Sequence, residues 1–298
     1  MSTAVDERAR ASVLGEAAWH ARRDAHERRV DAWTSPHLER RRTGEAHPVH
    51  DFLFTYYSQR PAALRRWHPG HGVVLAGDTT AYDGLKGYAA TSGGVTVPEA
   101  YVASQARMLR TLRTLLVATA ARPAQLGCFG LHEWAMVYRL DAVEVRHSSW
   151  PLRLGAAGTD AVVEQHRIRC THFDAYRFFT EPARPLNVLS PGRDDRAEHE
   201  QPGCLHAGMD LYKHAFRLTP MIASELVADC FALAREIREL DMRASPYDLS
   251  ALGYDPVPIE TAAGKQAYVE AQQDFVERGS PLRQRLVEEC DRLLAVGD

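Results

Sequence analysis

The sequence has few cysteines and no closely spaced pair of them. Its five cysteines are scattered through 298 residues, at Cys128, Cys170, Cys204, Cys230 and Cys290. Without a CxxC or CxxxC pair, a structural zinc knuckle is not expected. The odd number of cysteines and the lack of a signal peptide at the start predict reduced thiols and a cytoplasmic location.

Long apolar runs and a strong charge of either sign are also missing. No segment approaches the roughly 18 consecutive apolar residues of a membrane span, so no membrane partner is expected. The formal net charge is only -3, which gives the molecule no overall attraction to nucleic acid or to an anionic surface. Any binding site for a polyanion therefore has to be a local basic patch.

Helical patterns dominate what is present. One long helix is expected to begin at Pro98-Glu99 and to end near Pro123, and another runs from about Ser224 to Arg243. Residues 73–75 and 95–97 resemble short strands around a glycine-rich turn. The chain shows no internal repeat and no low-complexity linker. The sequence thus predicts a mainly α protein, a single helical domain with a minor β-hairpin element.

The first 46 residues differ from the rest because they are rich in alanine, glutamate and arginine. They predict a helical arm, broken near Ser35-Pro36, that is solvated or forms an oligomer contact; a phosphate-binding arm is the alternative. Residues 47–298 are expected to form one mainly helical domain that holds the functional site. Two separate helices, at roughly 260–278 and 281–296, are expected to close it.

Ionisable residues stand inside apolar, aromatic sequence in five segments: HPVHDFLFTYY, GLHEWAMVY, HRIRCTHFDAYRFF, CLHAGMDLYKHAF and ELDMRASPYDL. Read as a helix, the fourth sets His206, Asp210 and His214 four residues apart. Ionisable groups away from water must be paired, neutralised or bound to metal. Any one of them has an ordinary structural explanation, but the set is most simply explained if all five segments converge on one polar pocket.

The first chemistry that such a pocket allows is metal binding. His206 and Asp210 are one helical turn apart and can face one ion, as ligands in helical bundles do. Histidine and carboxylate ligands suit non-haem iron, manganese or zinc. The candidate ligand set is His132, His172, His206 and Asp210. A divalent transition metal at this set would serve an enzyme that acts on a small polar metabolite.

The second chemistry is cleavage of the bond between a sugar and a nucleobase. It needs a carboxylate that orients water or stabilises an oxocarbenium-like centre, and aromatic faces on which the base stacks. Asp174 or Asp210 is the candidate carboxylate, and His172 and His206 are candidates to orient or protonate the leaving base. The candidate substrate contacts are Trp134, Tyr176, Tyr212, Lys213, Arg243, and the basic pair Arg65 and Arg66 beside Trp67.

Long strings of the sequence resemble a group of actinobacterial proteins labelled 3-methyladenine DNA glycosylase. They are HDFLFTYYSQRPAALRRWHPG, CFGLHEWAMVYR, PLRLGAAGTDAVVEQHRIRCTHFDAYRFFT, QPGCLHAGMDLYK and ELVADCFALAREIRELDMRASPYDL, and the similarity covers roughly residues 47–290. The resemblance implies a hydrolase that excises alkylated purines from DNA in base excision repair. The LPGVGP-type hairpin of helix-hairpin-helix glycosylases is missing, so no catalytic residue is carried over. This group has Trp at the position of His214, which argues against His214 as a ligand.

Three functions therefore stay open at the level of sequence. The leading one is a nucleobase N-glycosidase that needs no cofactor and acts on DNA or on a small molecule containing a nucleobase. The second is the metal-dependent enzyme. The third is a non-enzymatic binding protein whose buried polar groups serve fold specificity. A contact through the N-terminal helix is the expected route to a homo-oligomer.

Overall fold

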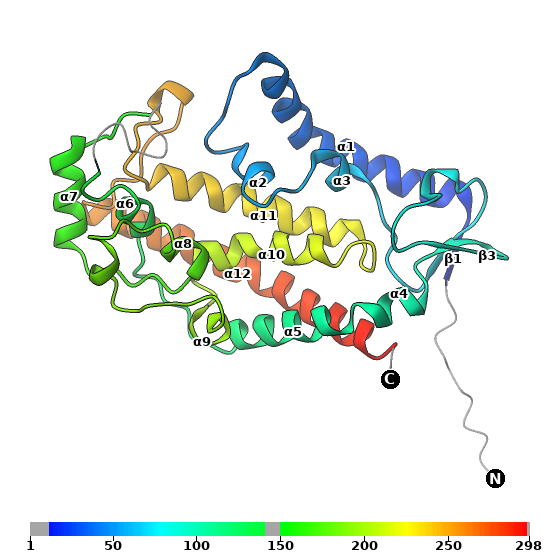
Figure 1. Ribbon diagram of the computed structural model, residues 1–298. Coiled ribbons are helices and arrows are strands. Elements are labelled where there is room, and N and C mark those ends of the chain that lie inside the picture. The colour runs from blue at the N-terminus through cyan, green and yellow to red at the C-terminus, as the bar shows by residue number, and fades with distance from the viewer. Residues whose placement is uncertain (1–11, 141–149, 297–298) are drawn as a thin grey trace, which may run out of the picture.

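The computed structural model describes residues 12–140 and 150–296, and it is mainly helical with one small sheet, as predicted (Figure 1). The long helices are α1 (Glu16–Thr43), α5 (Ala106–Ala120), α10 (Leu205–Arg217), α11 (Ser224–Arg243) and α12 (Ala262–Leu294). The shorter helices are α2 (Phe52–Thr55), α3 (Pro61–Arg65), α4 (Glu99–Ser104), α6 (Leu131–Ala135), α7 (Gly155–Gln165), α8 (Phe173–Tyr176) and α9 (Arg196–His199).

Helix α10 forms the centre of the molecule. It packs against both α11 and α12, and α5 covers α12 from the other side. The apolar side chains of α10, among them Leu205, Met209 and Leu211, are buried. His206, Asp210 and Lys213 follow a polar stripe of the same helix, and neighbouring elements cover this stripe too, since His206 and Asp210 are also buried. The polar residues of α10 are therefore carried into the core of the protein.

The small sheet has four strands in the order β1-β2-β4-β3, so it is larger than the predicted hairpin. Strand β1 (Ser12–Leu14) pairs in parallel with β2 (Val73–Leu75), and β4 (Gly94–Thr96) runs antiparallel to both β2 and β3 (Ala89–Thr91). The two extra strands are β1, from the N-terminal segment, and β3, which forms a hairpin with β4. In Figure 1 the sheet lies at the end of the molecule opposite α6, α7 and α8.

Two helices continue through a proline where the sequence predicted a break. Helix α1 contains Pro36, and α12 contains Pro281, so the predicted break in the arm and the two separate C-terminal helices are wrong. Proline removes the hydrogen bond to the carbonyl oxygen four residues earlier. Those oxygens belong to Ala32 and Glu277, which are exposed. Water can therefore satisfy them, and the helices continue.

Helix α1 packs along the body of the protein. Trp19 and Val30 are fully buried on its inner face. Arg22 forms an ion pair with Glu225 at the start of α11, at 2.9 Å. Such exposed pairs contribute little each, so the buried apolar face is what holds α1 in place. The arm is thus not solvated on all sides.

All five cysteines are thiols without a disulfide bond. Cys230 and Cys290 are fully buried and belong to the hydrophobic core. Within the two described ranges, none of the helices has both the length and the apolar character needed to cross a membrane.

Candidate functional site

A cavity of about 210 Å³ lies where five helical segments meet, near α2, α6, α8, α10 and α11. It is smaller than the roughly 300–1,000 Å³ of pockets that hold drug-sized ligands. Its size therefore suits a single heterocycle or a small metabolite. The cavity is lined by Phe52, Thr55, Tyr56, Glu133, Met136, Asp174, Phe178, His206 and Arg238.

Planar groups form one wall of the cavity. Phe52 and Tyr56 lie one turn apart at α2, and their rings stack with centroids 4.8 Å apart and planes 11° apart. The guanidinium carbon of Arg238 lies 3.8 Å from the centre of the Phe52 ring. Nε and Nη2 of Arg238 are buried without a hydrogen-bond partner in the described part of the chain. Buried donors of this kind are costly unless a ligand or water accepts from them.

Helix α1 fixes the position of this wall. Asp51, which precedes α2, accepts hydrogen bonds from Nδ1 of His37 at 2.8 Å and from the backbone N–H of His47 at 2.9 Å. Arg40 also binds Asp51. Burial raises the pKa of Asp51, but the bonds from Arg40 and His37 outweigh it and hold that pKa below its usual value. The C-terminal half of α1 is therefore tied to α2 through a charged, partly buried link.

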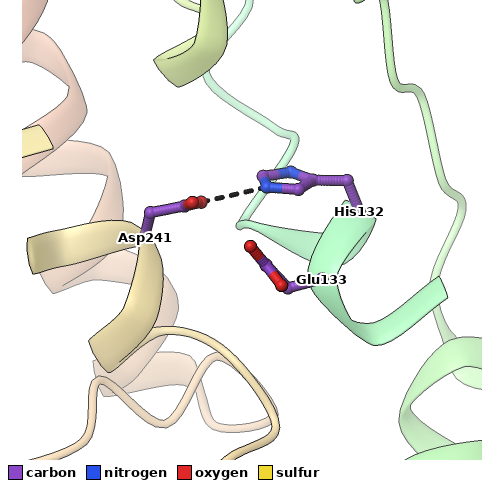
Figure 2. A group of neighbouring side chains, drawn as sticks. All are labelled: His132, Glu133 and Asp241. Carbon is purple, nitrogen blue, oxygen red and sulfur yellow. Dashed lines mark ion pairs between the residues drawn. The ribbon is translucent and has the colours of Figure 1, made fainter. Parts of the chain in front are cut away.

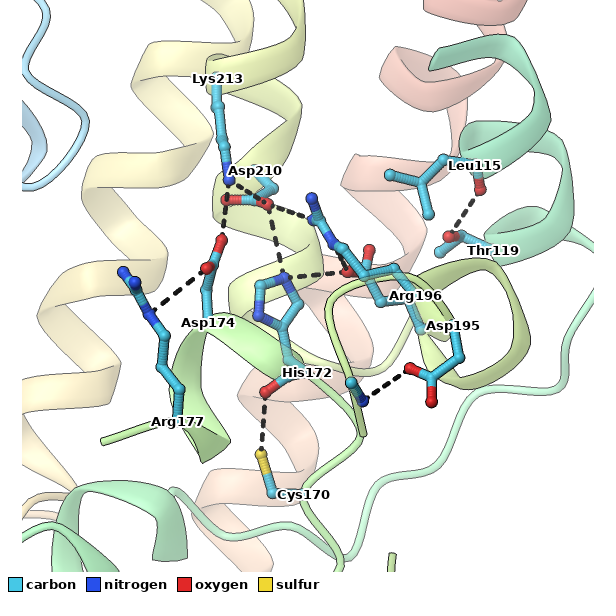
Figure 3. A network of polar contacts seen from close by, with 12 residues as sticks. Leu115, Thr119, Cys170, His172, Asp174, Arg177, Asp195, Arg196, Asp210 and Lys213 are labelled. Carbon is cyan, nitrogen blue, oxygen red and sulfur yellow. Dashed lines mark hydrogen bonds and ion pairs between the residues drawn. The ribbon is translucent and has the colours of Figure 1, made fainter. Parts of the chain in front are cut away.

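Asp174 is the accessible carboxylate of a larger polar network (Figure 3). Nζ of Lys213 lies 2.9 Å from Oδ2 of Asp174 and 3.2 Å from Oδ2 of Asp210. Nε of Arg177 lies 3.5 Å from Oδ1 of Asp174. Burial alone would raise the pKa of Asp174, but the charge of Lys213 holds it below its ordinary value. Asp174 is therefore ionised at neutral pH.

Asp210 belongs to the same network but is buried, with 1% of its side chain exposed. It accepts hydrogen bonds from Tyr57 Oη at 2.9 Å and from Arg196 Nη2 at 2.8 Å. His172, also fully buried, lies with Nε2 3.4 Å from both Asp210 and Glu200. Burial favours a raised pKa for Asp210, but contact with His172 and the nearby charges hold it well below its usual value. Neither Asp210 nor His172 lines the cavity.

A second cluster joins α6 to α11 on the other side of the cavity (Figure 2). Nε2 of His132 lies 3.0 Å from Oδ1 of Asp241. Nη1 of Arg238 donates to Glu133 at 2.8 Å and to Asp241 at 2.7 Å. Burial lowers the pKa of His132, but the charge of Asp241 outweighs it and the net pKa is raised. Two cations thus balance two buried carboxylates.

His206 lies between the two clusters and faces the cavity. Its ring centroid is 4.6 Å from that of His132, edge to face, and 5.4 Å from that of His172. Burial, followed by the charge of His132, holds the pKa of His206 well below its ordinary value. The cavity therefore contains a neutral imidazole at neutral pH. The three imidazoles, with Asp210 next to His172, lie in one neighbourhood. Of these four residues only His206 lines the cavity, so the predicted convergence on a single pocket is met only in part.

Three of the predicted aromatic contacts lie away from the cavity. Trp134 is fully buried, and its Nε1 donates to the carbonyl oxygen of Ala244 at 2.9 Å. Tyr212 is also fully buried, against the ring of Phe231. Tyr176 packs on core residues and does not line the cavity. These three rings therefore do not face the cavity, and the aromatic residues that line it are Phe52, Tyr56 and Phe178.

The predicted basic contacts are also elsewhere. Arg243 donates to the carbonyl oxygen of Asp255 and lies outside the cavity. Arg65 is paired with Glu27 and Asp31, at 2.8 and 2.7 Å, and with Arg66 it lines a separate cavity near the sheet. The neighbouring Trp67 is only 1% exposed, so it cannot act as a wedge. Lys213 is the one predicted basic contact in the networks described above.

Sequence reasoning missed Arg238 and Phe52 as lining residues. Arg238 stands on the buried face of α11 with Ala234, Ile237 and Asp241. A charged residue at an apolar position of an amphipathic helix is a detectable signal, because burial there requires a partner. Phe52 carried no such signal, since an aromatic residue in an apolar run is ordinarily core.

The metal set proposed from sequence does not form a compact group. Among the described residues, the side chains whose ligand atoms all lie within 4.8 Å of one another are His132, Glu133 and Asp241. Only His132 is shared with the predicted set of His132, His172, His206 and Asp210. Asp241 enters the group because α11 lies opposite His132, and Glu133 enters it because it follows His132 on α6.

Comparison of the chain with protein-family models, curated proteins and solved structures gives no match. The resemblance to the proteins labelled 3-methyladenine DNA glycosylase therefore stays a prediction, and the function has to be argued from the cavity itself.

Proposed function

We propose that the protein is a nucleobase N-glycosidase, a hydrolase that releases N-alkylated purines from DNA or from a nucleotide. One observation carries the proposal: a single small cavity combines stacked aromatic rings with an ionised carboxylate, Asp174, and a neutral imidazole, His206. A cavity of this size accepts one base and no duplex. A base in DNA would therefore have to enter it flipped out of the stack.

A base with a positive charge fits the cavity best. The ionisable lining residues are two carboxylates, Glu133 and Asp174, one guanidinium, Arg238, and the neutral His206. A cationic group can lie over these rings, as the guanidinium of Arg238 does over Phe52. Alkylation of a purine ring nitrogen makes the base cationic, and such a base leaves as a neutral molecule. It needs no proton from an acid, which agrees with the low pKa of His206.

The reaction breaks the bond between C1′ of the sugar and the base nitrogen. The electron pair of the broken bond stays on that nitrogen and neutralises the positive charge of the alkylated base. Water adds to C1′ and gives a proton to the carboxylate of Asp174. The same carboxylate stabilises the positive charge that develops on the sugar. In this scheme His206 hydrogen-bonds the base, and the buried Asp210 and His172 support Lys213 and Asp174 without touching the substrate.

An open groove next to the cavity supports a substrate that carries phosphate. The groove has a volume of about 870 Å³ and shares Phe52 and Thr55 with the cavity. Arg41 and Arg60 line it, and neither forms an ion pair within the described residues. Glu45 and Asp51 also line the groove, so the two arginines are local cations and not part of a basic surface. Arginines beside the flipped base would contact phosphate and position the substrate.

The test measures free base by liquid chromatography. The substrates are methylated duplex DNA, 7-methylguanosine and 7-methylguanosine 5′-monophosphate. We expect the release of methylated bases and no release of unmodified ones. Asp174→Asn should lower kcat at least about 100-fold, because it removes the base that activates water. Asp229→Asn is the matched control. Asp229 also pairs with arginines, Arg29 of α1 and Arg285 of α12, but it does not line the cavity.

Two results would overturn the proposal. One is the absence of base release from every substrate with the enzyme in excess; tight binding of the base without release would then support a binding protein. The other is full activity of Asp174→Asn with an unchanged circular dichroism spectrum, which would remove Asp174 from the mechanism.

A further inference from the structure

The cluster of His132, Glu133 and Asp241 has the geometry of a cation site. Its three ligand atoms lie within 4.8 Å of one another (Figure 2). The side chains come from two helices, α6 and α11, that are both fixed in the core. All three residues are buried, at 6%, 6% and 0% exposure. Water therefore cannot compensate for groups that lack partners here.

The hydrogen bonds of Arg238 leave one oxygen of each carboxylate available. Nη1 of Arg238 binds Oε1 of Glu133 and Oδ2 of Asp241. Oε2 of Glu133 and Oδ1 of Asp241 are left over. Nε2 of His132 and Oδ1 of Asp241 are both buried and make no hydrogen bond of acceptable geometry among the described residues, although they lie 3.0 Å apart. A metal ion that replaces the proton of His132 would contact both atoms, because metal binding requires a deprotonated imidazole and releases its proton.

We propose that Nε2 of His132, Oε2 of Glu133 and Oδ1 of Asp241 bind one divalent first-row transition ion. One imidazole nitrogen and two carboxylate oxygens suit manganese, iron or zinc, whereas calcium and magnesium prefer oxygen ligands alone. Arg238 is then the outer partner that orients both carboxylates, a role that commonly supports metal ligands. The inference does not depend on the glycosidase reaction.

The cavity gives the ion a route to the site. Glu133 of the cluster and Arg238, which binds Glu133, both line the cavity. His206 lies on the same side, with its ring edge to face against His132. An ion bound by three protein groups keeps an open position. That position would face the cavity, where a substrate atom or water can occupy it.

The experiment uses full-length protein stripped with EDTA and dialysed. Zn²⁺ and Mn²⁺ are titrated in separate calorimetry runs, and the metal content after gel filtration is measured by elemental analysis. We expect one equivalent of at least one ion and a higher melting temperature in its presence, because binding to the folded state stabilises it. Glu133→Gln should weaken binding at least about tenfold, because it removes a charged ligand, and loss even of a group that only supports a ligand typically costs that much.

Asp174→Asn is the matched control, since it removes a carboxylate from the same cavity but not from the cluster. It should bind the ion as the wild type does. If Glu133→Gln does not fold, His132→Gln takes its place. The inference is overturned if neither ion binds the wild type in a saturable way, or if a folded cluster variant binds it equally well. Metal binding is measured without substrate, so this failure is distinct from failure of the glycosidase proposal.

Discussion

Lys213 controls the charge of the proposed catalytic carboxylate. It contacts Asp174 and Asp210 at once, at 2.9 and 3.2 Å, and is itself only partly buried. An ammonium group between two carboxylates favours the ionised form of both. The pKa of Asp174 is lowered largely for this reason, against the opposing effect of burial.

Replacing Lys213 by Gln should therefore shift the pH dependence of the reaction. Without the ammonium group the pKa of Asp174 rises, so the carboxylate is protonated at a higher pH. The acid limb of the kcat/KM profile of the variant should move to higher pH. At the pH where the wild type begins to lose activity, the variant should be less active than the wild type. Lys213→Arg keeps the charge and should leave the limb close to its wild-type position. An acid limb that is the same in all three proteins would contradict the role of Lys213.

At the level of single residues, the sequence pointed to only part of the site. Asp174, His206 and Lys213 were found because ionisable residues in apolar sequence must have partners. The roles of Trp134 and Tyr212 were wrong because a large aromatic ring satisfies the same pattern when it simply fills the core. Arg238 was missed because its two carboxylate partners are brought to it by tertiary packing, which no local pattern contains.

At the scale of elements, the start of α12 depends on a glycine. Thr261 caps the helix and accepts a hydrogen bond from the N–H of Gly264 at 3.0 Å. A Cβ at Gly264 would lie 2.0 Å from the carbonyl oxygen of Pro258. Backbone atoms cannot move aside as the end of a side chain can. In contrast, a Cβ at Gly279 in the same helix would make ordinary contacts of 3.6 and 3.7 Å.

The two glycines should therefore respond in opposite directions to the same substitution. Gly264→Ala should lower the free energy of unfolding by about 1–3 kcal/mol, because overpacking displaces the turn before α12. Gly279→Ala should raise it by up to about 1 kcal/mol, since alanine favours helix. Urea unfolding followed by circular dichroism measures both. Equal effects of the two substitutions would show that the close approach to Pro258 does not constrain α12.

The ends of helices could be predicted where a local signal in the sequence, such as a proline or a capping residue, is enough to set them. Helix α11 ends at Arg243, as the sequence indicated. The helices through Pro36 and Pro281 were not predictable in this way, because the cost of proline depends on whether water reaches the unpaired carbonyl. Strand β1 was missed because it consists of only three residues, which pair with β2 about 60 residues further along the chain. Such pairing is a property of the fold and not of the segment.

At the scale of the whole molecule, the groove next to the cavity should decide which substrates are used. Arg41 lies on α1 and Arg60 precedes α3. The groove is thus formed partly by elements that do not carry the proposed catalytic groups. Arg60→Ala should raise KM for 7-methylguanosine 5′-monophosphate about tenfold, the loss expected for one charged hydrogen bond. The free nucleoside should be unaffected.

Arg65→Ala is the control, because Arg65 is exposed like Arg60 but paired with acids and outside the groove. Initial rates at varied substrate concentration give KM for both substrates. A loss that is equal for nucleoside and nucleotide would mean that Arg60 does not contact phosphate. The weak net charge of the chain makes such a local test necessary, since no overall basic surface guides the substrate.

The two carboxylates that line the cavity lie on two of the shortest α-helices of the described chain and not on the long ones. Glu133 and Asp174 stand on α6 and α8, which are only five and four residues long, while α10, α11 and α12 form the frame behind them. Short helices depend on that frame for their order and contribute little to it. Substitutions in these two segments should therefore change the lining of the cavity more than the stability of the frame, which itself contributes His206 and Arg238 to that lining.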